Sequence, residues 1–146
     1  MTSADAWTLM YRFVESTNRR AELADALGFR LGGGRGRILV QLRDGPATLS
    51  QLAERNGLDA PYVTLIVDKL ESHGLVERRP HPDDRRRKLV TLTDAGQGAL
   101  ATADEILYRP PDAMADLSTE ELDHLTAIMR RLVAAEAPEP PTANLS

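Results

Sequence analysis

Cysteine is absent from the 146 residues of this chain. A disulfide, a thiolate metal site, a cysteine nucleophile and a thiol redox switch are therefore excluded. Long apolar runs are missing too, and no stretch approaches the ~20 residues that a membrane-spanning helix needs. The first ten residues lack a basic start followed by an apolar stretch, so we expect no signal peptide and a cytoplasmic protein.

Motifs that carry catalysis or hold a cofactor are also missing. His73, His81 and His124 lie far apart without ligand spacing, which favours surface or helix-end residues over a metal site. The glycine-rich stretch LGGGRGR, interpreted as a hinge, lacks the G-K-[ST] of a phosphate-binding loop. No serine stands in a nucleophile motif. We therefore expect no catalytic residues, no metal, no cofactor and no enzymatic activity.

Acidic residues outnumber basic ones, and the net charge is −4. Residues 35–88, however, hold 11 Lys and Arg against 8 Asp and Glu, a balance of +3, while the remainder holds 7 against 14, a balance of −7. A basic segment thus lies within an acidic frame. The local balance, rather than the total, decides whether a surface can meet a phosphate backbone.

Two helices joined by a tight turn are predicted inside this basic segment. Thr48 with Gln51 forms a capping box for the first, and Asn56-Gly57 ends it. Asp59 caps the second, Pro61 suits its first turn, and Gly74 ends it. Its buried stripe is expected to contain Val63, Ile66, Val67 and Leu70. The pattern is that of a helix-turn-helix, although an ordinary pair of packed helices would show similar spacing.

A β-hairpin is predicted next. The β-prone segments 75–79 and 88–92 bracket PHPDDRRR, which is too long for a two-residue turn and contains no large apolar residue. Arginines at such a tip suit the narrow, electronegative minor groove of DNA. The alternative is a solvated charged turn, but the position directly after a helix-turn-helix favours a DNA-contacting wing.

The predicted fold is therefore mainly α-helical with a small β-hairpin wing. Residues 31–93 are expected to form a winged helix-turn-helix lobe, residues 1–30 and 94–136 a helical dimerisation region, and residues 137–146 a disordered tail. One long helix is predicted from residue 5 to about 27, and Thr93 and Ser118 are expected to cap later helices separated by Pro110-Pro111. Apolar stripes at the chain's two ends predict a homodimer.

The solvent-facing start of the second helix of the helix-turn-helix is expected to read base edges, and its later residues and the wing to contact the backbone and minor groove. The predicted DNA-binding residues are Ala60, Pro61, Tyr62, Thr64, Leu65, Lys69, Arg85, Arg86 and Arg87. Asp68 faces the same side, and Asp84 is expected to pair with a nearby arginine and hold the shape of the wing.

The combination resembles the MarR family of bacterial transcription regulators. The resemblance spans nearly the whole chain and is most specific in LSQLAERNGLDAPYVTLIVDKLESHGLVERR and PDDRRRKLVTLTDAG. It implies that Asp84 braces the wing, that Arg86 enters the minor groove, and that first and last helices build an obligate homodimer. It also implies ligands between the dimerisation helices and the DNA-binding lobe.

We therefore expect a dimeric regulator that binds a pseudo-palindromic double-stranded DNA operator, a repressor relieved by a small aromatic or anionic molecule. The expected effector pocket contains Trp7, Tyr11, Arg30 and Arg37, although Trp7 and Tyr11 at one helical turn's spacing are favoured as dimer-core residues. The rivals are a ligand-independent or architectural DNA-binding protein of the same fold, and a winged-helix protein–protein interaction module.

Overall fold

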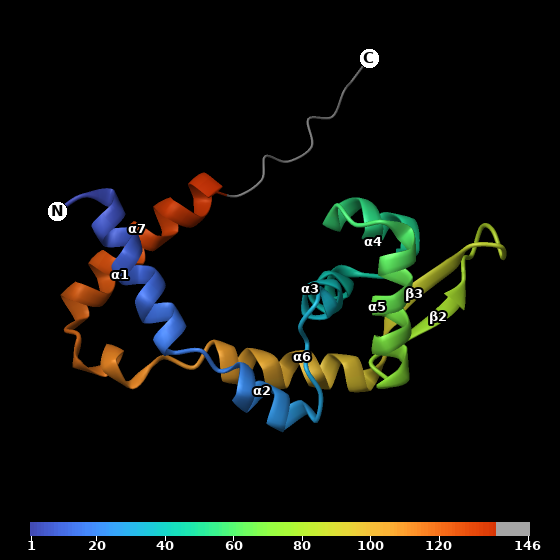
Figure 1. The fold of residues 1–146 in the computed structure, drawn as a ribbon, viewed down its shortest axis with the longest axis horizontal. Coiled ribbons are helices and arrows are strands. Elements are labelled where there is room, and N and C mark those ends of the chain that lie inside the picture. Colours follow the sequence, from blue (N-terminus) through green and yellow to red (C-terminus); the bar gives the residue numbers. More distant parts are fainter. Residues whose placement is uncertain (137–146) are drawn as a thin grey trace, which may run out of the picture. The chain divides into compact units, whose positions relative to one another are not determined.

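The chain divides into two units, Met1–Arg109 and Pro110–Ser146, which are described separately. The computed structural model describes residues 1–136, and the predicted disordered tail lies outside the described residues. The first unit contains α1 (Ser3–Ser16), α2 (Arg20–Leu27), α3 (Arg35–Gln41), the 3-10 turn η1 (Leu42–Asp44), β1 (Ala47–Thr48), α4 (Leu49–Asn56), α5 (Ala60–Ser72), β2 (Val76–Pro80), β3 (Lys88–Leu92) and α6 (Asp94–Leu107). Figure 1 labels its helices and the strands β2 and β3.

The single long helix predicted from residue 5 to about 27 is wrong, because the chain breaks between α1 and α2. Apolar spacing carries across the break, but polar side chains at residues 16–18 bind nearby backbone groups. The Thr17 hydroxyl donates to the carbonyl of Val14 at 3.0 Å, and the Asn18 side chain accepts from the amide of Arg20 at 2.9 Å. Such local hydrogen bonds compete with the helical ladder and favour a turn.

The sheet has three antiparallel strands in the order β1-β3-β2, one more than the predicted hairpin. β2 and β3 pair from Val76 opposite Leu92 to Pro80 opposite Lys88. The additional strand, β1, is two residues long and pairs with β3 through Ala47 and Thr48. Thr48 also caps α4, so the first helix of the helix-turn-helix begins directly at the sheet.

The core of the first unit lies where α3, α4, α5 and the sheet meet. Its buried side chains include Ile38, Leu39, Leu52, Val63, Val67, Leu70, Val76 and Val90, together with Ala99 and Leu100 of α6. The predicted stripe of α5 is confirmed, since Val63, Ile66, Val67 and Leu70 are all buried. Burial of this apolar surface is what holds α5 in place.

Helices α2 and α6 pack against each other within the first unit. Arg19, which precedes α2, donates to the carbonyl of Ile106 at 2.7 Å and to that of Arg109. Glu22 forms an ion pair with Arg109, which holds the pKa of the Glu22 carboxyl below its ordinary value. Helices α2 and α6 are thus held together by these contacts, and the predicted domain boundaries and the dimerisation role of these helices remain a proposal.

The second unit contains the 3-10 helix η2 (Asp112–Asp116) and α7 (Thr119–Glu136). The predicted capping box is confirmed: the amide of Glu121 donates to the Ser118 hydroxyl at 3.2 Å, and the amide of Ser118 donates to the Glu121 carboxylate at 2.8 Å. Leu125, Ile128, Leu132 and Val133 remain exposed on α7. Among residues 1–136, no helix is both long and apolar enough to cross a lipid bilayer.

Candidate DNA-binding surface

Local capping sets where α4 and α5 begin and end. The Thr48 hydroxyl accepts from the amide of Gln51 at 3.1 Å, and the Gln51 side chain accepts from the amide of Thr48 at 2.9 Å. Gly57 then adopts a left-handed conformation, with φ of 60°, that ends α4. The Asp59 carboxylate caps α5 by accepting from the amide of Tyr62 at 2.8 Å. These caps confirm the helix-turn-helix boundaries predicted from the sequence.

The solvent face of α5 presents short and apolar groups at its start. Ala60, Pro61 and Leu65 are exposed, and Leu65 keeps 64% of its surface accessible. Thr64 is half-buried, and its hydroxyl donates to the carbonyl of Ala60 at 3.0 Å. Because that hydrogen is already used, the Thr64 oxygen is left mainly as an acceptor toward a ligand.

Tyr62 lies on the flank of α5 and contacts the glycine-rich segment. Its hydroxyl donates to the carbonyl of Gly33 at 3.0 Å. A shallow hollow of about 370 Å³ opens beside the ring, lined by Leu31, Gly33, Gly34, Arg37, Asn56, Leu58 and Tyr62. The segment predicted as a hinge is thus tied to the start of the candidate reading helix.

The wing tip consists of residues 81–87 and is shaped by its own hydrogen bonds. The Asp84 carboxylate accepts from the amide of Arg86 at 3.0 Å, and the Asp84 carbonyl accepts from the amide of Arg87 at 3.0 Å. Across the tip, the amide of His81 donates to the carbonyl of Arg87 at 3.0 Å. In the described part of the chain Asp84 forms no ion pair with an arginine, so it holds the turn through a backbone amide.

Sequence reasoning missed Arg78 of β2, which joins the wing to α5. Its guanidinium forms ion pairs with Asp68 at 2.5 Å and with Glu71 at 2.9 Å, and its side chain is only 20% exposed. The two carboxylates lie three residues apart, so they project from one side of the helix. The sequence pattern gave no sign of this contact, because a basic residue in a β-prone segment does not indicate its partners in another element.

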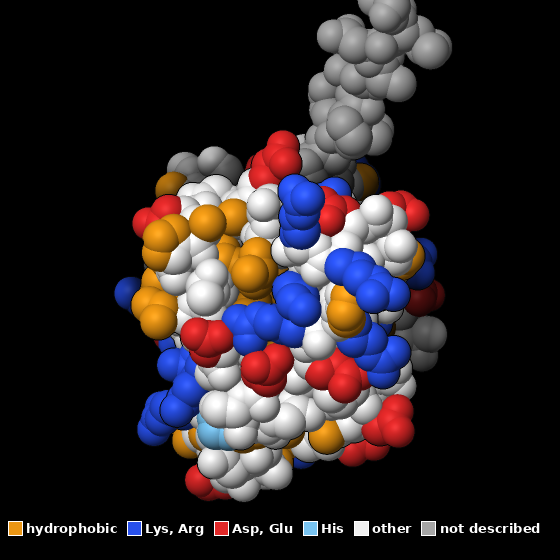
Figure 2. Space-filling model, turned by 90° about the vertical axis from the view of Figure 1, so that its right-hand side faces the viewer, with side chains coloured by type: hydrophobic (Ala, Val, Ile, Leu, Met, Phe, Trp, Pro, Cys, Tyr) orange, Lys and Arg blue, Asp and Glu red, His pale blue; other side chains and the backbone are white. Residues whose placement is uncertain are grey.

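Basic side chains dominate the wing tip. Arg85, Arg86, Arg87 and Lys88 are all exposed. Figure 2, which turns the wing side of Figure 1 toward the viewer, shows Lys and Arg side chains over this face with Asp and Glu between them. Lys69 is exposed on α5 next to Asp68, whose carboxylate is neutralised by Arg78. The predicted DNA-binding residues therefore lie on α5 and on the wing that is joined to it.

The four predicted effector residues come from α1, from α3 and from the segment between α2 and α3. Trp7 and Tyr11 are neighbours on α1, with ring centroids 6.4 Å apart, and both are exposed. Arg37 lines the hollow beside Tyr62, and among the described residues neither Trp7 nor Tyr11 lines it. The carbonyl of Arg30 accepts from the Arg35 guanidinium at 2.8 Å.

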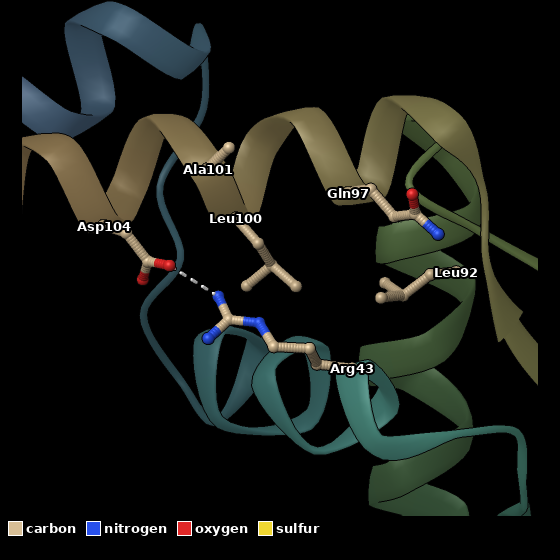
Figure 3. Close-up of a pocket in the computed structure, with 6 residues that line it drawn as sticks. All are labelled: Arg43, Leu92, Gln97, Leu100, Ala101 and Asp104. Atoms are coloured by element: carbon tan, nitrogen blue, oxygen red, sulfur yellow. Dashed lines mark hydrogen bonds and ion pairs between the residues drawn. The ribbon is translucent and has the colours of Figure 1, made fainter.

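A second hollow, of about 270 Å³, lies between η1 and α6 (Figure 3). Arg43 and Asp104 cross it with an ion pair of 2.9 Å, and Leu92, Gln97, Leu100 and Ala101 complete its lining. Its two charges therefore neutralise each other. No group of three His, Cys, Asp or Glu side chains with metal-binding geometry occurs in residues 1–136.

A capped helix-turn-helix joined to a basic, protruding hairpin defines a winged-helix DNA-binding protein. A model of the MarR family matches residues 35–88. A probable transcriptional regulator from Pseudomonas aeruginosa is 34% identical, over 84% of this chain and 93% of that one, with a TM-score of 0.53. The chain belongs to the MarR family of transcription regulators.

Two further solved structures share the fold. RV1404 from Mycobacterium tuberculosis superposes with a TM-score of 0.77 and 24% identity, over 92% of both chains. A MepR mutant from S. aureus bound to an oligodeoxyribonucleotide superposes with a TM-score of 0.64 and 19% identity, over 92% of this chain and 98% of that one. At these identities the likeness concerns the fold alone.

Proposed function

We propose that this protein is a dimeric, sequence-specific repressor that leaves its operator when a small aromatic or anionic ligand binds. The single observation that supports DNA binding is that α5 and the wing, the two elements expected to contact DNA, are joined within one unit. Arg78 holds the wing stem against Asp68 and Glu71 of α5. The reading helix and the arginine-rich tip therefore meet DNA as one body.

Helix α5 would read the major groove through its first turns. Leu65 offers only apolar contact, which suits a thymine methyl group, while the Thr64 oxygen suits the amino group of adenine or cytosine. Ala60 and Pro61 allow close approach, and Lys69 would meet phosphate. Arg86 would enter the minor groove, with Arg85 and Arg87 on the flanking phosphates. MepR, a relative in fold, has been crystallised with DNA.

Dimerisation is supported by apolar surface that the single chain leaves uncovered. On α1 the exposed large side chains are Trp7, Leu9, Tyr11, Phe13 and Val14, and on α7 they are Leu125, Ile128, Leu132 and Val133. On α1, Trp7, Tyr11 and Val14 follow one face at helical spacing, and exposed apolar faces of this kind mark interfaces. A twofold dimer would present two α5 helices to a pseudo-palindromic operator, about 34–36 Å apart for successive major grooves.

The support for ligand control is the chemical character of the side chains rather than an enclosed pocket. The Trp7 and Tyr11 rings offer apolar faces to a flat molecule, and Arg30 is a cation for its acidic group. For such a ligand to regulate, it must bind one spacing of the two reading helices better than the other, because equal affinity shifts no population.

The test is binding of the parent protein to promoter DNA, starting with the region upstream of its own gene. A selected duplex should bind far more tightly than a scrambled duplex of equal length, and affinity should fall with added salt. Equal affinity for both duplexes would refute sequence-specific regulation and support an architectural role. Absence of binding to either would support a protein–protein interaction module.

A further inference from the structure

We propose that Arg37 binds a phosphate of the DNA backbone on the side of α5 opposite the wing. The proposal rests on the DNA-binding function proposed above and adds a contact from outside the helix-turn-helix and the wing. It also gives Arg37 a different role from the effector-binding one expected from the sequence.

The guanidinium of Arg37 is exposed and uncommitted. In the described residues it takes part in no hydrogen bond or ion pair, whereas Arg35 is held by the carbonyl of Arg30 and Arg43 by Asp104. It lines the hollow whose other polar side chains come from Tyr62 and Asn56. The Asn56 amide already exchanges hydrogen bonds with Gln41, at 2.9 and 3.0 Å. Among the residues that line this hollow, Arg37 therefore supplies the charged group that can bind a ligand.

The start of α3 is held close to the reading helix. Besides the bond between the Tyr62 hydroxyl and the Gly33 carbonyl, the backbone at Gly34 approaches α5 closely. A Cβ at Gly34 would lie 3.2 Å from the Cδ1 atom of Ile66, and its φ of 88° is left-handed. The left-handed φ favours glycine there, and an added Cβ would also require the Ile66 side chain to shift by a few tenths of an ångström. Arg37, one turn further on, is positioned relative to α5 by these contacts.

Arg37 and the hollow that it lines lie on the side of α5 away from the wing. Tyr62 and Glu71 are nine residues apart, which places them on opposite sides of the helix, about half a turn round its axis. Glu71 and Asp68 face the wing through Arg78, so Tyr62 and the hollow lie on the flank away from the wing. A helix in the major groove has a sugar-phosphate strand on each side. The wing serves one strand, and Arg37 meets the other.

A small carboxylate ligand offers the same anionic chemistry. The observations favour the phosphate, because Arg37 is exposed rather than enclosed and the hollow opens beside the face that carries the readers. An exposed arginine beside the flank of a reading helix is suited to a backbone phosphate, a contact that contributes affinity without sequence preference.

The experiment measures fluorescence anisotropy with a duplex selected from random sequence by the parent protein, and with a scrambled duplex. Arg37→Ala should weaken binding to both by a similar factor, roughly three- to tenfold, and should lower the salt slope by about 1.8, because the proposed dimer loses one phosphate contact from each protomer. Arg37→Lys should retain most of the affinity. Arg20→Ala, which removes the same charge from exposed α2, is the matched control and should bind as the parent does.

Tyr62→Phe keeps the ring and removes only the hydroxyl that binds Gly33. Because this loosens the start of α3, Arg37→Ala should cost less affinity in the Tyr62→Phe background than in the parent. The proposal is overturned if Arg37→Ala has the parent's affinity and salt slope, or if its loss is confined to the selected duplex. It is also overturned if DNA binding is unchanged but release by salicylate disappears, which would assign the hollow to a small anion. A parent that binds neither duplex would instead refute the proposed function.

Discussion

The backbone of Gly96 in α6 lies directly against the carbonyl of Leu75, the residue before β2. A Cβ built on Gly96 would stand 2.0 Å from that carbonyl oxygen, far inside van der Waals contact. Thr93, which caps α6, donates its hydroxyl to the neighbouring carbonyl of Gly74 at 2.5 Å. The start of α6 is therefore seated on the turn that ends α5 and begins the wing.

Gly96→Ala should destabilise the protein for this reason. The backbone must shift to accommodate the methyl group, and overpacking of this kind lowers the free energy of unfolding by about 1–3 kcal/mol. Gly98→Ala is the matched control, because a Cβ there meets nothing within 4 Å and helix propensity favours alanine by up to about 1 kcal/mol. Urea denaturation measures both variants. Equal midpoints for Gly96→Ala and the parent would contradict the close approach.

Arg86 should be the most sensitive arginine of the wing. The Asp84 carboxylate accepts from its amide and shapes the tip, and a guanidinium in the minor groove gains from focused negative potential. Arg86→Ala should weaken operator binding by roughly 1–3 kcal/mol, and Arg85→Ala and Arg87→Ala by less. Anisotropy titrations at one fixed salt concentration measure this. Parent-like binding by Arg86→Ala would remove the wing from the DNA interface.

Substitutions on α5 should separate sequence preference from general affinity. Thr64→Ala and Tyr62→Ala should change the selected consensus, because they alter groups at the reading end of the helix. Lys69→Ala should weaken all duplexes alike if its ammonium group meets phosphate. Selection from random DNA, followed by sequencing, measures the preference. Recovery of the parent's consensus by both Thr64→Ala and Tyr62→Ala would show that another element reads the bases.

The apolar face of α7 should be required for the dimer. Leu125→Asp or Ile128→Asp would place a carboxylate in the proposed interface and should give monomeric or unfolded protein that no longer binds the operator. Ala127→Asp adds the same charge on the opposite side of α7 and should remain dimeric. Sedimentation velocity at low micromolar concentration measures the state. A folded Leu125→Asp monomer with full DNA affinity would argue against dimeric binding.

Salicylate-like acids should weaken operator binding if Trp7 and Tyr11 contribute to an effector site. Trp7→Ala should reduce this response, because the indole supplies much of the apolar contact. Leu9→Ala, exposed on the same helix, is the control for general effects on α1. Operator affinity is measured with and without the acid in each variant. An equal response in parent and Trp7→Ala would place the site elsewhere, and no response in the parent would end the case for this ligand class.

The helix ends could be predicted from the sequence because caps are local. Thr48 with Gln51, Asp59, Thr93, and Ser118 with Glu121 each act within one turn of their own helix. The β-prone composition that indicated β2 and β3 is similarly local. The break before α2 was missed because apolar spacing continues through it, while the deciding bonds come from Thr17 and Asn18.

Long-range contacts could not be predicted. β1 has two residues, too few for any periodic pattern, and it forms only because β3 offers a free edge. The Tyr62 hydroxyl meets the Gly33 carbonyl 29 positions away in the chain, and Arg78 meets carboxylates of another element. The sequence indicated that Tyr62 is exposed and that Arg78 is charged, but not which groups they contact. Only the packing of α3 and β2 against α5 decides which partners they have.

The wing consists of a stem anchored in the sheet and a tip that is shaped by its own hydrogen bonds. In the stem, β3 pairs with β1 on one side and with β2 on the other, and its Val90 is buried. Residues 81–87 are held by hydrogen bonds within the tip and by the neighbouring strand ends. DNA contacts of the tip and the stability of the core thus depend on separate residues, so substitutions of exposed tip side chains should change the free energy of unfolding by no more than about 0.5 kcal/mol.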